Sequence, residues 1–344
     1  MRLSVCIATY NRAGFIAQTL ASIAPQLTED CELVVVDGAS TDATAQVMAE
    51  FVSRHPRTVY RRESSNGGVD QDYDKAVGYA SGQYCWLMSD DDILVPDAIA
   101  TVLARLESEP ELVIVNAEVR TKDLAVVLKP AQLDMPADRD FSAADAESLF
   151  TQAAGYLSFI GAVIVRRASW LARERVSFHG SLFIHVGVIF QAPSLGRAVV
   201  IARPLILIRY GNAMWSARGF EIWIEKWPRL VWSFAHFSEP ARQAVSPRHP
   251  ATSLKVLLHY RAIGAYGPAE YEALLAGGKR PHHPFAKFVA ALPARALNAA
   301  MALYCVARGH AGARMMLYDL ANARCAGPVT RWAARRSRFP ETGR

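Results

Sequence analysis

The sequence predicts an α/β fold built on a doubly wound, mostly parallel sheet, followed by a C-terminal helical extension. Strand-like apolar runs alternate with helix-like segments as far as Asn116. Polar clusters follow three of these runs at the point where each run ends. Such alternation is typical of βαβ units, whose ligands bind beyond the carboxyl ends of the strands. After Trp215 the sequence changes to tryptophans at helical spacing and then to segments rich in alanine and arginine, which indicates helices.

The strands and helices are expected in a regular order. Short runs rich in valine, isoleucine and leucine are typical of buried parallel strands, and they occupy Leu3–Ala8, Glu32–Val36, Thr58–Arg61, Tyr84–Met88 and Leu112–Asn116. The segments between them have the pattern of helices, over residues 15–23, 40–52, 73–80 and 96–106. Loops and a short helix are expected from Leu124 to Ser158, and strand-like runs return at Ala162–Val165 and Val199–Ile208.

The charge distribution divides the chain into two expected domains, 1–215 and 216–344. The net charge of +6 combines a balance of −6 in the first region with +12 in the second. The basic helices between Phe285 and Arg338 have two interpretations: they lie on an anionic membrane surface, or they form an ordinary solvated domain. Nucleic acid is not an expected partner, because no recognised DNA- or RNA-binding motif accompanies this charge.

Composition and cysteine spacing limit the class of protein. With 51% hydrophobic and 20% charged residues the chain has the composition of a globular protein. Its five cysteines are scattered without a C-x-x-C pair, so neither a disulfide framework nor a zinc site is expected. We identify no signal peptide and no segment of about 20 apolar residues that would span a bilayer. We therefore expect a cytoplasmic protein. The basic helices add the alternative that it associates peripherally with the inner face of the cytoplasmic membrane.

Three adjacent carboxylates, Asp90, Asp91 and Asp92, follow the apolar run Tyr84–Met88. Unpaired carboxylates repel one another in a partly buried site. Mg²⁺ or Mn²⁺ relieves that repulsion, because hard divalent cations take oxygen ligands and share them with phosphate oxygens. The alternative is a structural role at the start of the helix that Pro96 opens. One carboxylate would suffice for that role, so the cluster favours a metal site.

The polar residues after the first two strands predict a binding crevice at the same edge of the sheet. Asp37 follows the run Leu33–Val36, a position that suits a carboxylate accepting hydrogen bonds from a base or a ribose. Its alternative role is turn formation in the Asp-Gly pair, which is common. Thr9 and Tyr10, after the first strand, are open to the same two interpretations.

Four segments together resemble family 2 glycosyltransferases. They occur in the order and spacing seen in that family: VCIATYNR (Val5–Arg12), VVVDGASTDAT (Val34–Thr44), NGGVDQDYDKAVGYASG (Asn66–Gly82) and YCWLMSDDDILVP (Tyr84–Pro96). The resemblance covers roughly the first 110 residues. It implies an A-type glycosyltransferase fold, a nucleotide-sugar donor, a divalent metal at the Asp-x-Asp motif and inversion at the anomeric carbon. A softer similarity links the Asp-Tyr-Asp-Lys stretch to bacterial abequosyltransferase-like enzymes of O-antigen assembly.

The resemblance also implies roles for individual residues. Those expected to bind the donor are Ala8, Thr9, Tyr10, Arg12, Asp37, Asp74, Lys75, Asp90 and Asp91. Asp90 and Asp92 are expected to hold the metal, with Asp92 as the main ligand. The expected acceptor is a glycan or a polyprenyl-diphosphate-linked oligosaccharide in bacterial surface polysaccharide assembly.

The general base is where the chain departs from the family. An inverting enzyme needs a base on the acceptor hydroxyl, and relatives usually take it from a later acidic residue. The corresponding stretch, Phe178–Gly187, contains no carboxylate. His185 is the nearest substitute, because imidazole is a competent base near neutral pH. Its alternative is a core histidine among apolar neighbours, and His179 and Glu118 are weaker candidates for the base.

Three other functions are alternatives to transfer of a sugar. A sugar nucleotidyltransferase would carry a glycine-rich, arginine-containing phosphate loop after the first strand, and an oxidoreductase would carry Gly-x-Gly-x-x-Gly there. The segment Thr9–Gly14 is neither. A non-catalytic scaffold within a polysaccharide assembly complex is supported only by the missing acidic base.

Overall fold

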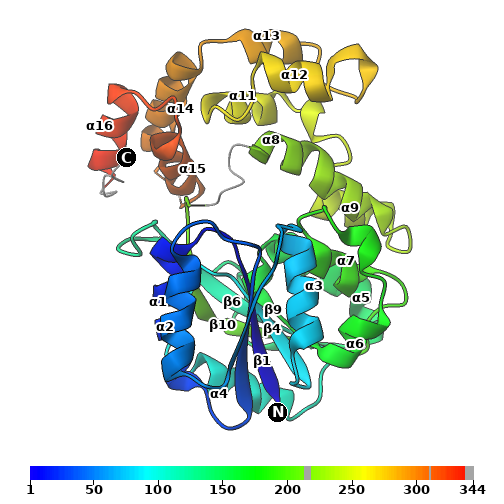
Figure 1. The fold of residues 1–344 in the computed structure, drawn as a ribbon. Coiled ribbons are helices and arrows are strands. Elements are labelled where there is room, and N and C mark those ends of the chain that lie inside the picture. The colour runs from blue at the N-terminus through cyan, green and yellow to red at the C-terminus, as the bar shows by residue number, and fades with distance from the viewer. Residues whose placement is uncertain (213–217, 310, 338–344) are drawn as a thin grey trace. The chain divides into compact units, whose positions relative to one another are not determined.

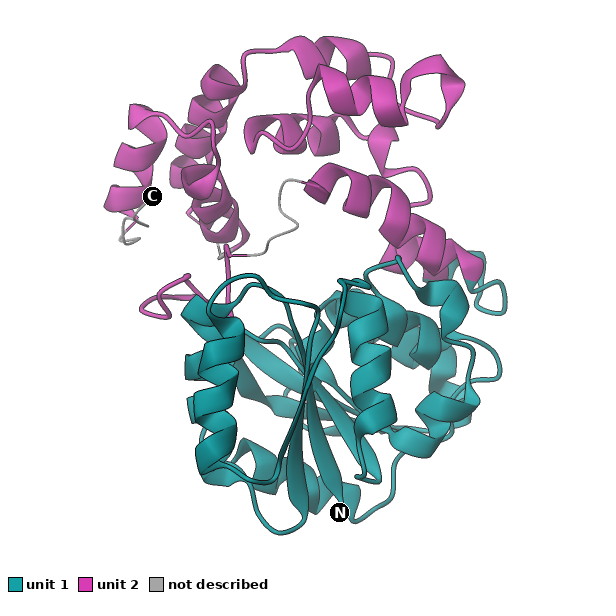
Figure 2. Ribbon diagram, in the orientation of Figure 1, with its two compact units in different colours: residues 1–118, 130–208, 234–241 teal, residues 119–129, 209–233, 242–344 magenta. Residues whose placement is uncertain are grey.

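The computed structural model describes residues 1–212, 218–309 and 311–337. Two compact units are coloured separately in Figure 2. Unit 1 comprises residues 1–118, 130–208 and 234–241, whereas unit 2 comprises residues 119–129, 209–233 and 242–344. Both units are therefore assembled from separate stretches of the chain. The expected domain boundary at Trp215 lies outside the described residues.

The first four long strands of the sheet pair in parallel, as predicted, and Figure 1 shows the first of them beside the fourth. The central strand pairs in parallel with two neighbours, and its register aligns Thr9 with Asp37. The first, second and fourth of these strands are buried along their whole length, as expected for strands covered on both faces. Their bounds are β1 (Leu3–Thr9), β2 (Cys31–Asp37), β3 (Thr58–Arg62) and β4 (Tyr84–Met88).

The other side of the sheet contains antiparallel pairs. β9 pairs antiparallel with both β4 and β6, and β5 pairs antiparallel with β10. The order is β3-β2-β1-β4-β9-β6-β10-β5, with β7 on β6 and β8 on β10. The predicted α/β class is confirmed, although periodicity gave no strand directions for this side. The strand bounds are β5 (Ile93–Leu94), β6 (Leu112–Arg120), β7 (Val127–Lys129), β8 (Arg139–Phe141), β9 (Val163–Arg166) and β10 (Ala198–Arg209).

Helices cover the sheet of unit 1. Buried side chains of α1, α2 and α4 share one apolar core with alternate residues of the central strands. α3 contacts β1, β2 and α6. It begins at Val69, four residues before the predicted start at Tyr73, because Gly68 adopts φ 90° and reverses the chain there. The helix bounds are α1 (Ala13–Ile23), α2 (Thr44–Arg54), α3 (Val69–Tyr79), α4 (Ala98–Leu106), α5 (Ala146–Ala153), α6 (Arg167–Ala172) and α7 (Ile184–Phe190).

Unit 2 is largely helical, as the sequence predicted. Phe220 stacks on Tyr266 with ring centroids 4.3 Å apart at the centre of one apolar cluster. The buried amide of Asn298 donates to the carbonyls of Ala262 and Leu320, which joins three helices. None of the described helices is long and apolar enough to cross a membrane. The helix bounds are α8 (Gly219–Glu221), α9 (Trp227–Ser233), α10 (Glu239–Val245), α11 (Leu254–Ala262), α12 (Pro268–Leu274), α13 (Ala286–Ala291), α14 (Ala294–Arg308), α15 (Ala311–Asn322) and α16 (Pro328–Arg336), of which α10 spans the change from unit 1 to unit 2.

Candidate functional site

The loops that follow β1 and β2 are tied together by hydrogen bonds. Asn11, at φ 54°, receives the backbone N–H of Thr41 on its Oδ1 atom at 2.7 Å. The Asn11 backbone N–H donates to Ser40 Oγ at 2.9 Å, and the Arg12 N–H donates to Thr44 Oγ1 at 3.0 Å. The two loops therefore form one surface at the carboxyl ends of the strands, which is where the sequence predicted a crevice.

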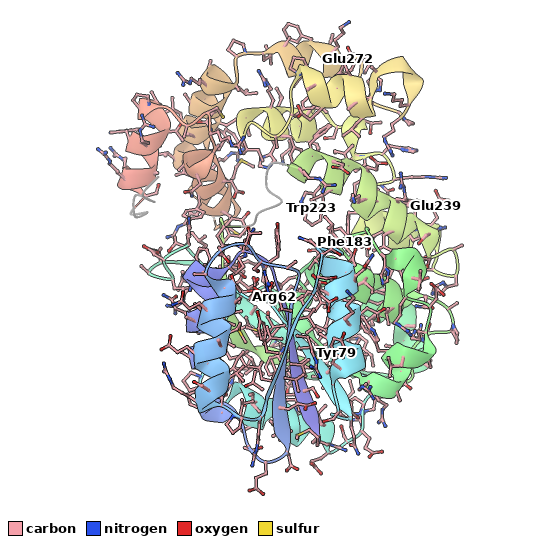
Figure 3. All side chains as sticks on the ribbon, viewed as in Figure 1. Arg62, Tyr79, Phe183, Trp223, Glu239 and Glu272 are labelled. Carbon is pink, nitrogen blue, oxygen red and sulfur yellow. The ribbon has the colours of Figure 1, made fainter. Side chains whose placement is uncertain are left out.

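Asp37 is fully buried at the end of β2. Its Oδ1 atom accepts the Ser40 backbone N–H at 2.7 Å, and its Oδ2 atom accepts the Tyr60 hydroxyl at 2.7 Å. Burial and the Asp37 carboxylate raise the pKa of Tyr60, so that its hydroxyl stays a donor. Arg62, labelled in Figure 3, places its Nε atom 3.9 Å from Asp37 Oδ2. The carboxylate is thus held in one orientation before any ligand arrives.

Asp72 is a site residue that the sequence reasoning missed. A Cβ atom on Gly38 would lie only 2.6 Å from Asp72 Oδ2, so the loop after β2 can approach this carboxylate only because residue 38 is glycine. Asp72 is 2% exposed, and its Oδ1 atom has no hydrogen-bond partner among the described residues. Burial, followed by the charges of Glu63 and Asp37, raises the pKa of Asp72 to about 6, against the opposing effect of Lys75. An orphaned carboxylate oxygen at this position suits a ligand that donates a hydrogen bond.

The Gly67-Gly68 pair before Val69 is the sequence signal for an earlier start of the helix, which would have brought Asp72 into consideration as a helical residue. Each residue of a helix is rotated by about 100° around the helix axis, so side chains two residues apart point to nearly opposite sides. Asp72 faces the loop after β2, whereas Asp74 accepts the Trp170 indole N–H at 2.9 Å and contacts Arg175 Nε at 2.8 Å. Asp74, predicted to bind the donor, is therefore engaged with the 170–179 segment, and its donor role stays a prediction.

Lys75 forms an ion pair with Glu63. Its Nζ atom lies 2.6 Å from Glu63 Oε2, and this contact, followed by nearby carboxylates that include Asp72, raises the pKa of the ammonium group. Lys75 therefore carries its charge close to the Asp37–Asp72 pair. Its role toward the donor stays a prediction, as do the roles of the buried Ala8 and Thr9 and of the partly exposed Tyr10.

Arg12 connects the first loop to the carboxylates that follow β4. Its Nε atom lies 3.4 Å from Asp90 Oδ1, and its second guanidinium arm lies 3.4 Å from Asp91 Oδ2. Burial and the neighbouring Asp91 charge nevertheless raise the pKa of Asp90 to about 7. A guanidinium shared by two carboxylates leaves the cluster with excess negative charge, which favours the approach of a cation.

Asp92 is 2% exposed, and its charge acts on the buried Tyr73 and on the partly buried Tyr156. Burial and then the Asp92 charge raise the pKa of Tyr156, and burial followed by the three aspartates raises that of Tyr73. Within the described residues, no three His, Cys, Asp or Glu side chains form a ready metal cage. Mg²⁺ and Mn²⁺ do not require one, since they bind through one or two carboxylates together with substrate phosphates and water. The oxygen donors present fit such an ion.

His185 lies inside the protein. Its side chain is 1% exposed on α7, and its Nε2 atom lies 2.6 Å from the Leu157 carbonyl oxygen, a contact that makes Nε2 the protonated nitrogen. Burial lowers the pKa of His185 to about 4. These properties favour the core interpretation over the base interpretation, so the catalytic role of His185 stays a prediction.

The loop before α7 is held by Asp70, which the sequence reasoning also missed. Asp70 is buried, and it accepts the backbone N–H groups of Leu182 at 2.8 Å and Ile184 at 3.1 Å. Leu182 adopts φ 72°, an uncommon conformation for leucine that these bonds help to maintain. On the same loop His179 is partly exposed, with Nε2 3.5 Å from Asp74 Oδ2. Of the two histidines, only His179 therefore offers its ring to solvent beside a carboxylate.

Known proteins resemble this chain in sequence and in fold. Residues 4–147 match the family model described as glycosyl transferase family 2. Abequosyltransferase RfbV of Salmonella typhimurium is 27% identical over 232 residues, which cover 64% of this chain and 70% of that protein. TarS 1–349 of S. aureus in complex with UDP has a TM-score of 0.55 at 15% identity, over 98% of this chain and 92% of that one.

A second solved structure shares the fold. Mannosyltransferase PcManGT from Pyrobaculum calidifontis, in complex with GDP-Man and Mn²⁺, has a TM-score of 0.51 at 19% identity, over 93% of this chain and 86% of that one. The predicted resemblance to family 2 and the A-type fold are confirmed by these matches. The chain is a glycosyltransferase.

Proposed function

We propose that this glycosyltransferase moves a sugar from a nucleotide-sugar donor, with a divalent cation at Asp90 and Asp92, and inverts the anomeric carbon. The observation that carries the proposal is the position of three polar loops at the carboxyl ends of β1, β2 and β4, where parallel sheets bind nucleotides. The similar proteins add support, because two of them are described with UDP or with GDP-Man and Mn²⁺.

The proposed metal site uses the carboxylates that follow β4. Asp92 would be the main ligand and Asp90 would share the ion or reach the ribose. A divalent cation supplies a Lewis acid that neutralises the charge on a departing nucleoside diphosphate. Arg12, 3.4 Å from both Asp90 and Asp91, would keep these two carboxylates oriented toward the donor.

The proposed nucleoside site lies against the end of β2. The buried Ala8 and Thr9 and the partly exposed Tyr10 would border it, and the Asp37 carboxylate, fixed by Ser40 and Tyr60, would accept a hydrogen bond from the base or ribose. Asp72, whose Oδ2 atom lies against Gly38, adds a second acceptor through its Oδ1 atom, which has no partner among the described residues. Preformed acceptors bind a donor group without the entropic cost of ordering flexible side chains.

The proposed acceptor is a glycan or a polyprenyl-diphosphate-linked oligosaccharide of bacterial surface polysaccharide assembly. The support is the sequence similarity to abequosyltransferase RfbV over 232 residues. Peripheral membrane association fits the same proposal. Unit 2 exposes the large side chains of Phe288, Tyr304 and Trp332. Arg308 lies over the Tyr304 ring and Arg336 lies over the Trp332 ring. Mixed aromatic and cationic surfaces bind anionic membranes.

Asp92→Asn tests the proposal. Transfer should fall by at least about 10²-fold, the usual cost of removing an electrostatic contact to developing charge, and the stabilisation of the protein by a nucleoside diphosphate with Mn²⁺ should be lost. The melting temperature without ligand should be unchanged or raised, because the substitution removes one repelling charge. Asp97→Asn is the matched control, since Asp97 is an exposed carboxylate that pairs with Arg203. Wild-type transfer in the presence of a chelator would refute the metal assignment.

A further inference from the structure

Unit 2 contains a pocket that the proposed donor site does not use. Its volume is about 290 Å³. Its walls come from the segment Ile224–Trp232, the turn Arg248–Ala251 and the turn Lys279–Pro281. Three stretches that are distant in sequence therefore converge on one cavity, and all of them belong to unit 2. The volume suits a small ligand rather than a polymer segment.

The lining of this pocket is strongly basic. Among the described residues, the lining contains Arg229, Arg248, Lys279 and Arg280 against a single carboxylate, Glu225. Arg229 and Arg280 both contact the same Oε1 atom of Glu225. One carboxylate oxygen cannot neutralise two guanidinium groups, and four cations facing one anion leave a net positive charge of about three in a partly enclosed space, where charges are less screened than on an open surface.

Trp232 orients one of the cations. The Arg248 guanidinium lies 5.0 Å from the centre of the Trp232 ring. Stacking of this kind uses the face of the guanidinium and leaves its N–H edge for hydrogen bonds to an anion. The Trp232 indole N–H donates to the Ser246 carbonyl at 3.0 Å, so the ring itself is fixed.

A glycine pair precedes two of the cations that line the pocket. Gly277 and Gly278 adopt φ 70° and 71°, a conformation that other residues rarely take, and the chain then turns so that Lys279 and Arg280 line the pocket. Lys279 Nζ donates to the carbonyls of Glu272 at 3.0 Å and Ala273 at 3.1 Å near the end of α12. An ammonium group has three donors, so one is left for a ligand.

We propose that this pocket binds the phosphate or diphosphate group of a phosphorylated substrate. Several guanidinium groups with an ammonium group match the geometry and charge of phosphate oxygens. Ile224, Pro228 and Pro250 of the same lining offer an apolar surface to the carbon part of the molecule. Under the proposed function this molecule is the acceptor, and that identification, unlike the phosphate site itself, rests on the proposed function.

Isothermal titration with inorganic pyrophosphate tests the site in the full chain, with chelator present so that the metal site does not contribute. We expect saturable binding that weakens about tenfold in Arg248→Gln, because one charge-assisted hydrogen bond is worth roughly that factor. Arg229→Gln should weaken it similarly. Arg324→Gln, which removes an exposed arginine of unit 2 outside the pocket, is the matched control. Unchanged melting temperatures would show that each variant is folded.

Two further arms identify the source of the phosphate. One uses a soluble sugar phosphate, and the other uses neutral vesicles that carry a small fraction of a polyprenyl diphosphate. Arg248-dependent binding in either arm supports the proposal and names the source. No pyrophosphate binding by the wild-type chain, or equal binding by Arg248→Gln and wild type, would overturn it. Neither result depends on sugar transfer, so this test and the Asp92 test fail independently.

Discussion

His185→Gln distinguishes a core histidine from a general base. The glutamine side chain keeps an N–H group for the Leu157 carbonyl, which His185 Nε2 contacts at 2.6 Å, but it cannot take up a proton. The pKa of His185 is about 4 in the folded protein against an ordinary 6.5. Because the folded pKa is lowered, stability is complete above pH 6.5 and is lost as the pH falls toward 4, where the unfolded chain takes the proton first.

The size of this effect follows from the two pKa values. At about 1.4 kcal/mol for each pH unit, burial of the neutral ring removes about 2 kcal/mol of unfolding free energy at pH 5 and about 3 kcal/mol at pH 4. His185→Gln removes this acid-dependent loss. For a unit of this size, 2 kcal/mol corresponds to about 4–8 °C in melting temperature. Between pH 7.5 and pH 5, the melting temperature of the variant should therefore fall by about 4–8 °C less than that of the wild type.

The assay measures melting temperature at both pH values, nucleotide affinity and turnover on the same protein. A core histidine predicts turnover within a few-fold of wild type at pH 7.5. A general base predicts a loss of about 10²–10⁴ with donor affinity unchanged. A loss of that order, with no gain in acid stability, would refute the core interpretation and establish the role predicted from the sequence. Retained turnover would direct the search for the base to His179 and Glu118.

Two further predictions concern the donor site and the membrane. Gly38→Ala should weaken nucleotide binding about tenfold or more, because the new Cβ would lie 2.6 Å from Asp72 Oδ2. Gly14→Ala is the control: its new Cβ would have nothing within 4 Å, so the titrated nucleotide affinity should be unchanged. Equal affinities in the two variants would contradict the assigned contact. The protein should sediment with anionic liposomes at low salt and be released at high salt. Phe288→Asp should reduce sedimentation, whereas Val176→Asp should not, although both residues are well exposed. If the wild-type protein is recovered wholly in the supernatant at low salt, only the solvated-domain interpretation is left.

The sequence by itself determined the parallel strands and the polar loops of unit 1. β1, β2 and β4 are continuous apolar runs because both faces of a central strand are buried, and such runs are visible in sequence without knowledge of their partners. Asp37 and the aspartates from Asp90 follow those runs directly, so their common edge could be predicted from local order alone. The helical region beyond Trp215 could likewise be predicted from the local change to basic, helix-forming sequence.

Only the tertiary structure decided which side chains face the site. Asp72 and Asp74 are two residues apart on α3, and the packing of that helix against β1 and β2 brings Asp72, not Asp74, to Gly38. His185 is buried because α7 packs all its residues inside. The apolar neighbours of His185 in the sequence left a core histidine and a general base both open, and only the packing of α7 favours the core interpretation. Orientation and burial depend on contacts between segments far apart in the chain, and periodicity within one segment does not contain them.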